Sequence, residues 1–170
     1  MIYHTDITLS TQLVAYLKRA TGYDVIREFQ ATTQGMPSAP VLTYFKVSDK
    51  RVGLPWRDDV WNETTQIMTH YEVQRYESTF QVGALSTKDS SDAVNIAAIS
   101  MAGEEAIEYF KQYFIGVLQT TGGEVRNPYF VNDKDQFQAS PSFDVTLVYN
   151  RARIVTTPVV TTVEYNVGRV

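Results

Sequence analysis

Two stretches of the chain repeat their apolar residues at helical spacing. The first, residues 9–21, predicts an amphipathic helix with one buried face. Ser10 is the expected N-cap, and Gly22 is the expected end. The face expected to be buried holds Leu13, Val14, Leu17 and Ala20.

The second helical stretch begins with a group of capping residues at 89–92 and continues to the glycine pair at 122–123. Gly103 is expected to break or kink it. Beyond that glycine, acidic residues open the segment, where the helix dipole favours them. The apolar positions that predict a continued helix there are Ile107, Phe110, Phe114, Val117 and Leu118.

Other segments alternate with a period of two, which is typical of strands. Residues 23–29 and 41–47 predict short strands, and residues 65–85 predict one long strand. Its apolar side changes near Tyr76, so a bulge or bend is expected there. Two further strands, 143–149 and 159–167, are expected to pair through a turn at residues 151–158.

Three segments lack periodicity and are expected to be connections. Residues 30–40 are rich in Gly, Pro, Ser and Thr, residues 48–64 break the strand pattern, and residues 124–141 carry several turn signals. Large aromatic side chains outside periodic segments often anchor protein interfaces. The candidates in these connections are Trp56, Trp61, Tyr129 and Phe130. For the two tryptophans, covering one end of the core is an equally good reading.

The order of elements is helix, strand, long strand, helix pair, strand, strand. This order predicts an α+β fold, a mainly antiparallel sheet with helices packed on one face and long β-hairpin or loop excursions. A chain of 170 residues is expected to form a single domain, residues 1–170.

Composition narrows the possible partners. The formal net charge is −4, whereas a protein that grips nucleic acid phosphates needs an excess of Lys and Arg. The chain has no Cys, which excludes a disulfide scaffold and a thiolate metal site. Residues 1–9 have neither a basic stretch nor an apolar run, so no signal peptide is expected. No apolar run approaches the length of a bilayer span, so we expect a soluble protein without a membrane partner.

A search for catalytic groups finds little. The two histidines, His4 and His70, have no partner at metal-ligand spacing, and no nucleophile-elbow motif occurs. Residues 132–135 resemble the start of a calcium loop but lack its glycine and distal glutamate. The glycines do not form a phosphate-binding loop. The sequence therefore predicts no catalytic, metal-binding or cofactor-binding residues and a non-enzymatic protein.

Several features, taken in order, resemble the tail terminator family of tailed phages, also called neck, tail completion or head-to-tail joining proteins. They are a Gln- and Pro-containing loop that leads from Phe29 to Tyr44, the strand Phe80-Gln81-Val82, a helix led by Ser and Asp, and a late strand from Phe143 to Leu147. The likeness runs from about residue 9 to residue 167 by order of elements. Residues 55–61 depart from the family pattern.

The resemblance implies a homo-oligomer, expected to be a hexameric ring, stacked on the end of the tail tube. Such a ring would contact tube and possibly sheath proteins on one side and head connector or neck proteins on the other. DNA would pass through its lumen without specific binding, which suits an acidic protein. The protein would be found in the virion, and in the host cytoplasm during assembly. Function would lie in subunit contacts, with residues 48–64 and 124–141 as natural places for them.

Three alternatives stay open at this point. The chain could be a tail-tube or baseplate subunit with a related architecture, or a soluble module that binds a small ligand on its sheet. It could also be an enzyme whose site is assembled only in the fold.

Overall fold

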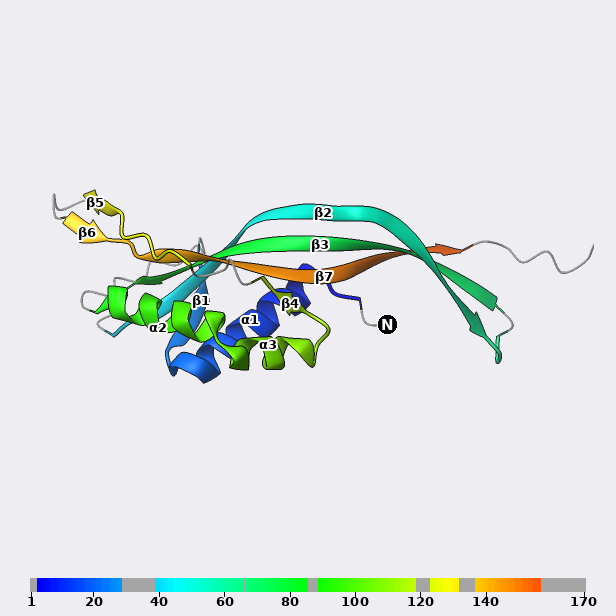
Figure 1. Cartoon of the computed structure of the whole chain (residues 1–170), viewed down its shortest axis with the longest axis horizontal. Helices are drawn as coiled ribbons and strands as arrows, with labels where there is room; N and C mark the ends of the chain where they lie inside the picture. The colour runs from blue at the N-terminus through cyan, green and yellow to red at the C-terminus, as the bar shows by residue number, and fades with distance from the viewer. Residues whose placement is uncertain are drawn as a thin grey trace, which may run out of the picture.

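The computed structural model describes residues 3–28, 39–65, 67–85, 89–118, 123–131 and 137–156. The molecule is elongated, with helices gathered under one half of a long curved sheet (Figure 1). The helices are α1 (Asp6–Thr21), α2 (Ser90–Ala102) and α3 (Glu104–Lys111). The strands are β1 (Asp24–Arg27), β2 (Val41–Asn62), β3 (Ile67–Leu85), β4 (Gly116–Val117), β5 (Tyr129–Val131), β6 (Phe137–Ala139) and β7 (Ser142–Thr156).

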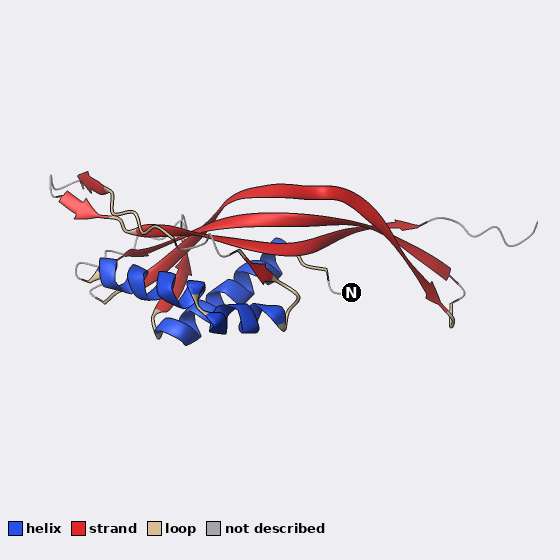
Figure 2. Ribbon diagram, viewed as in Figure 1, coloured by secondary structure: helices blue, strands red, loops and turns tan. Residues whose placement is uncertain are grey.

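The main sheet has the strand order β1-β2-β3-β7-β4. Only the β1–β2 pair is parallel, and the other three pairs are antiparallel. All three helices cover the same face of the sheet (Figure 2). The predicted α+β class, with a mainly antiparallel sheet, helices on one face and a long β-hairpin, is confirmed.

The core lies between the helices and the near half of the sheet. Aromatic residues from all layers meet there, including Tyr16 of α1, Phe110 of α3 and Phe143 of β7, each 0% exposed. Tyr16 also donates a hydrogen bond to the carbonyl of Ser100 at 2.8 Å, so its buried hydroxyl is satisfied. This packing fixes the helices on the sheet and leaves the far half of the sheet outside the core.

Helix α1 begins earlier than predicted. Thr5 is the N-cap, and its hydroxyl accepts a hydrogen bond from the Thr8 N–H at 3.3 Å. Ser10, the expected cap, lies inside the helix, and its hydroxyl donates to the carbonyl of Asp6 at 2.9 Å. The predicted end at Gly22 is confirmed, with φ of 74° in the left-handed region.

Strand β2 is the largest departure from the sequence prediction. Residues 48–62 are strand and not a loop, and they pair with β3 in a hairpin. The register slips between Lys46 and Ser48 and again between Val52 and Trp56. Gly53, with φ of 71°, and Pro55 lie in the second slip. An edge strand tolerates such residues at a bulge, which explains why they read as chain breaks in the sequence.

Strand β3 confirms the predicted long strand and its change of buried side. Val73 is buried on one parity, whereas Ser78, Phe80 and Val82 are buried on the other. Of the expected bulge or bend, a bulge in β3 is absent from its pairing with β7, which keeps unbroken register from Thr69 to Gly83. The irregularities lie in β2 instead. A bend agrees with the curvature of the long sheet (Figure 1).

The second helical stretch is shorter than predicted. Gly103 separates α2 from α3, as expected, but α3 ends at Lys111. Phe114, with φ of 57°, turns the chain, and residues 116–117 pair with β7 as β4. The predicted helix through Leu118 is therefore wrong. Phe114 and Val117 continue the helical spacing of apolar residues in the sequence, but they lie in a turn and in β4.

Two further predictions need correction. Residues 129–131 and 137–139, expected to be irregular, pair as the separate two-stranded sheet β5–β6. Residues 151–156, expected to be a turn, continue β7 alongside β3. The predicted strand at 159–167 and most of the loop at 30–40 lie outside the described residues.

Candidate functional site

The far half of the main sheet extends beyond the helices as a three-stranded projection, here called the β-arm (Figure 1). It consists of residues 47–62 of β2, 67–77 of β3 and 150–156 of β7. Unlike the near half, it carries many exposed apolar side chains. These are Val47, Leu54, Trp56, Val60, Trp61, Ile67 and Ile154. Exposed apolar residues gathered on one projection are typical of an interaction surface.

The two tryptophans predicted at interfaces both lie on the β-arm, but on opposite faces. Trp56 pairs with Val73, Trp61 pairs with Met68, and the register between them is unbroken. Positions five apart in a regular strand point to opposite sides. Trp56 is 38% exposed and Trp61 is 47% exposed, so neither covers the core completely. The structure therefore presents the two tryptophans, which are close in the sequence, as two separate aromatic surfaces.

Trp56 lines a shallow hollow of about 300 Å³ together with Phe114, Arg75 and the β7 residues Val148 and Asn150. Phe114 is exposed despite its size. Its backbone at φ of 57° turns the chain from α3 into β4. The hollow combines two exposed aromatic rings with a cation, which suits an inserted side chain of a protein partner.

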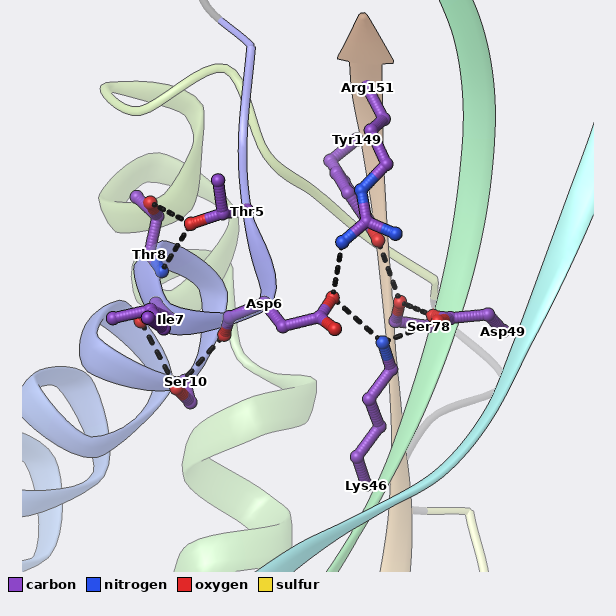
Figure 3. A network of polar contacts seen from close by, with 10 residues as sticks. All are labelled: Thr5, Asp6, Ile7, Thr8, Ser10, Lys46, Asp49, Ser78, Tyr149 and Arg151. Carbon is purple, nitrogen blue, oxygen red and sulfur yellow. Dashed lines mark hydrogen bonds and ion pairs between the residues drawn. The ribbon is translucent and has the colours of Figure 1, made fainter. Parts of the chain in front are cut away.

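A polar network anchors the base of the β-arm to the N-terminus of α1 (Figure 3). Asp6 accepts from Lys46 of β2 at 2.8 Å and from Arg151 of β7 at 3.0 Å. Lys46 also contacts Asp49, which in turn accepts from Ser78 of β3. The network therefore joins α1 to each of the three strands of the β-arm.

Burial and hydrogen bonds shift the pKa values of the side chains in this network. Burial alone would raise the pKa of Asp49, but hydrogen bonds from Lys46 and Ser78 outweigh it, and the pKa is lowered. Burial alone would lower the pKa of Lys46, but its bonds to Asp49 and Asp6 leave it raised. Burial raises the pKa of Tyr149, whose hydroxyl lies 3.3 Å from that of Ser78. The charged forms of Asp49 and Lys46 are thus the stable ones.

The residues that precede α1 also hold the β-arm. Tyr3 stacks on Tyr71 of β3 with ring centroids 5.4 Å apart and donates to Asp58 of β2 at 3.0 Å. The backbone N–H of His4 donates to the carbonyl of Asn150 at 3.0 Å. One short segment thus contacts all three strands.

The two histidines have structural surroundings. His4 is 4% exposed, and its Nε2 lies 2.6 Å from the carbonyl oxygen of Tyr113. His70 lies on the β-arm with Nδ1 2.6 Å from a carboxylate oxygen of Asp59. Hydrogen bonds from His70 and from Arg57 lower the pKa of Asp59. No nucleophile adjoins either ring in the contacts of the described residues, so the geometry favours a role in holding the chain.

Within the described ranges, no group of three or more His, Asp or Glu side chains is placed to hold a metal ion. No helix among those same residues is long and apolar enough to cross a membrane.

The other predicted interface residues, Tyr129 and Phe130, belong to β5. The β5–β6 sheet lies at the opposite end of the molecule from the tip of the β-arm (Figure 1). The structure therefore does not bring the four predicted residues together.

Sequence reasoning missed the network around Lys46. Apart from Lys46 and Asp49, its members are far apart in the chain, and Asp6 and Arg151 are separated by 145 positions. Single charged residues at such separations carry no spacing signal, so only the paired register of β2, β3 and β7 reveals them.

Comparisons with known proteins identify relatives. The sequence model of a family described as E217 gateway protein gp29 matches residues 6–159. A search among curated proteins gave no match.

Among solved structures, the chain is similar to the sheath/tube terminator of PVC, an extracellular contractile injection system, in its extended state. The TM-score is 0.58 at 9% sequence identity, and the match covers 100% of this chain and 65% of the terminator chain. This chain thus spans slightly less than two thirds of that protein's length, and at such low identity the likeness shows a shared fold.

Proposed function

The chain belongs to the family of the phage E217 gateway protein gp29, and on that premise we propose that it forms a ring that closes the phage tail and joins it to the head. The observation that carries this proposal is the family match, which extends from Asp6 of α1 to beyond the end of β7. The shared fold with a sheath/tube terminator supports the same role.

The role is structural, and the protein belongs to the virion. We extend this to a chain that carries no catalytic residue, acts as one domain over residues 1–170 and assembles in the host cytoplasm. The described polar residues support the non-enzymatic proposal, because the network around Lys46 joins four elements of the fold and its one serine hydroxyl, that of Ser78, donates to Asp49.

The ring we propose is a hexamer whose neighbours contact each other heterologously, since a rotation that closes generates a ring. Trp56 and Trp61 on the β-arm, and Tyr129 and Phe130 in β5, are the proposed contact residues. Because the tip of the β-arm and the β5–β6 sheet lie at opposite ends of the subunit (Figure 1), the arm can meet a neighbour or one face of the ring while β5–β6 meets a different partner. Those partners would be tail tube and sheath proteins on one side and head connector proteins on the other.

DNA would pass through the lumen of this ring without being held. A net charge of −4 supports that, because specific or tight binding to phosphates requires a surplus of cations. An acidic channel repels the DNA backbone and lets it slide.

Deletion and complementation test the proposal. A phage without this gene is expected to make tails of abnormal length or tails that stay unattached, seen by negative-stain electron microscopy. Wild-type protein supplied from a plasmid should restore virions, and so should Lys111→Ala, a change at a 72% exposed α3 side chain away from the β-arm. Trp56→Ala/Trp61→Ala should not restore them. Normal virions from the deletion would refute the proposal.

The mass of the purified protein separates the alternatives. A discrete ring under light scattering supports a terminator. Extended polymers would instead favour a tail-tube subunit, and a monomer that binds a metabolite would favour a small-ligand module.

A further inference from the structure

The β-arm has two open edges within the described residues. On β2, the pairing with β1 ends at Tyr44, so residues 47–62 are paired to β3 alone. On β7, the pairing with β4 covers only residues 147–148, and His4 bonds to Asn150. Residues 151–156 are therefore also paired to β3 alone. An open edge presents backbone N–H and C=O groups that can pair with another strand.

The two edges differ in how well they can accept a strand. The slip that contains Gly53 and Pro55 disrupts the β2 edge, since bulges and prolines are common protections of edge strands. Residues 56–62 beyond it keep regular register with β3 and contain no proline. That short segment is the part of the β2 edge suited to strand addition.

Chain direction decides how the edges of two copies can meet. β2 and β7 both run antiparallel to β3, so they point the same way and lie on opposite sides of it. A rotation about a ring axis preserves strand direction along that axis. In a ring, the β7 edge of one copy can therefore meet the β2 edge of the next copy only in parallel.

Side-chain chemistry favours one register for this pairing. Ile154 and Asp58 both pair with Tyr71, so Ile154 lies on the same face as Asp58 and Val60. If Ile154 lies opposite Val60 of the next copy, two exposed apolar side chains meet. The same register places Arg153 opposite Asp59. A shift of two residues that puts Ile154 opposite Asp58 would place Arg153 opposite Arg57, which is repulsive.

We propose that neighbouring subunits join by parallel strand addition, with residues 151–156 of one copy paired to residues 56–62 of the next and Ile154 opposite Val60. This inference rests on the proposed ring and specifies how its subunits are joined. The result is a sheet that continues from subunit to subunit around the ring.

Engineered disulfides test this arrangement, and the natural chain has no Cys to interfere. Within one chain, β3 separates β2 from β7 by about 9–10 Å, and Ile154 is level with Asp58 and not with Val60, so the two positions are farther apart than that. That exceeds the separation of about 7 Å that a disulfide tolerates, so any bridge forms between chains. Under mild oxidation of the full chain, Val60→Cys/Ile154→Cys is expected to lose its monomer band on a non-reducing gel and give a ladder of multimers.

The matched control is Val60→Cys/Val155→Cys, which keeps Trp61, places the second thiol on the face opposite to that of Ile154 and should leave the monomer band intact. Each single variant should also stay monomeric on the gel. Dimers from Val60→Cys alone would overturn the inference, because they indicate twofold pairing of two β2 edges. A ladder from Asp58→Cys/Ile154→Cys in place of the expected variant would overturn the register.

Light scattering on the reduced samples separates this inference from the function it rests on. A ring without a ladder from the Val60/Ile154 pair refutes strand addition and leaves the ring standing. A chain that stays monomeric at every concentration tested refutes both.

Discussion

Replacing Lys46 by Met tests whether the polar network holds the β-arm on the body of the protein. The side chain is only 24% exposed and bonds to both Asp6 and Asp49. Met keeps most of its length and apolar stem and removes only the charge. In this variant Asp6 would keep its ion pair with Arg151 at 3.0 Å. Asp49, which is 28% exposed, would keep only the hydrogen bond from Ser78.

The expected loss follows from these contacts. A hydrogen bond to a charged group contributes about 1.5–3 kcal/mol when it is shielded, and a solvent-exposed ion pair contributes about 0–1 kcal/mol. The Lys46–Asp49 contact is partly shielded and lies between these two cases, whereas the Lys46–Asp6 contact is more exposed and contributes less. Together they lead us to expect that the free energy of unfolding falls by about 1.5–2.5 kcal/mol. For a chain of this size that corresponds to a melting temperature lowered by about 3–10 °C.

The assay is urea denaturation followed by circular dichroism, with Lys50→Met as the control. Lys50 lies on the same strand, is 77% exposed and is 3.6 Å from Glu77, so its loss should cost at most about 0.5 kcal/mol. The difference between wild type and Lys46→Met should also depend on pH. Because the folded pKa of Asp49 is lowered, its contribution is complete above its ordinary pKa and disappears as pH falls through the lowered one. A Lys46→Met variant as stable as Lys50→Met at pH 7, or a difference that persists unchanged at low pH, would refute this account of the anchor.

Three further changes probe other parts of the molecule. Thr5→Ala removes the N-cap contact to Thr8 and should lower the free energy of unfolding by about 1 kcal/mol in urea titrations; an unchanged midpoint would show that the cap is dispensable. Gly22→Ala forces a side chain into the left-handed region and should lower the free energy of unfolding by about 1–2 kcal/mol in the same titrations. Gly103→Ala is the control, because Gly103 has φ of −77° and should tolerate a side chain. Equal losses at both positions would contradict the argument from φ. Trp61→Ala should leave the melting temperature in calorimetry nearly unchanged, because the side chain is half exposed. The same change should weaken the oligomer measured by light scattering. A lower melting temperature with an intact oligomer would mean that this tryptophan packs within its own subunit.

The sequence predicted the half of the fold that has one buried face. In α1 and in the late strand around Phe143, apolar residues recur with the period of the element because the core lies on one side only. The same rule made the long β3 recognisable, including the change of buried side between Val73 and Ser78. Where one face is buried, the pattern of the sequence follows the structure.

The β-arm could not be predicted in the same way. It has no helix on either side, so selection for a buried face does not impose a period of two on residues 48–62. Gly53 and Pro55 then read as breaks, although a bulge in an edge strand accommodates both. Residues 151–156 were misread for the same reason, since Arg151 and Arg153 flank Ala152 in a strand that is solvated on both faces.

The candidate interface residues stay a prediction. Large aromatic residues outside periodic segments drew attention to Trp56 and Trp61, and the structure places both, partly exposed, on the β-arm. Their opposite orientations follow from strand geometry, which an assumed loop cannot supply. The partners of Lys46 needed the register of three strands.

The unbroken β3–β7 register, from Thr69 to Gly83, also determines how the subunit bears mechanical load. Hydrogen bonds in an antiparallel pair run perpendicular to the strands. A pull along the β-arm therefore strains the whole ladder in shear at once, whereas a pull across it would peel the bonds one by one. The slips in β2 interrupt its ladder, so under axial tension the outer strand is the one that yields first.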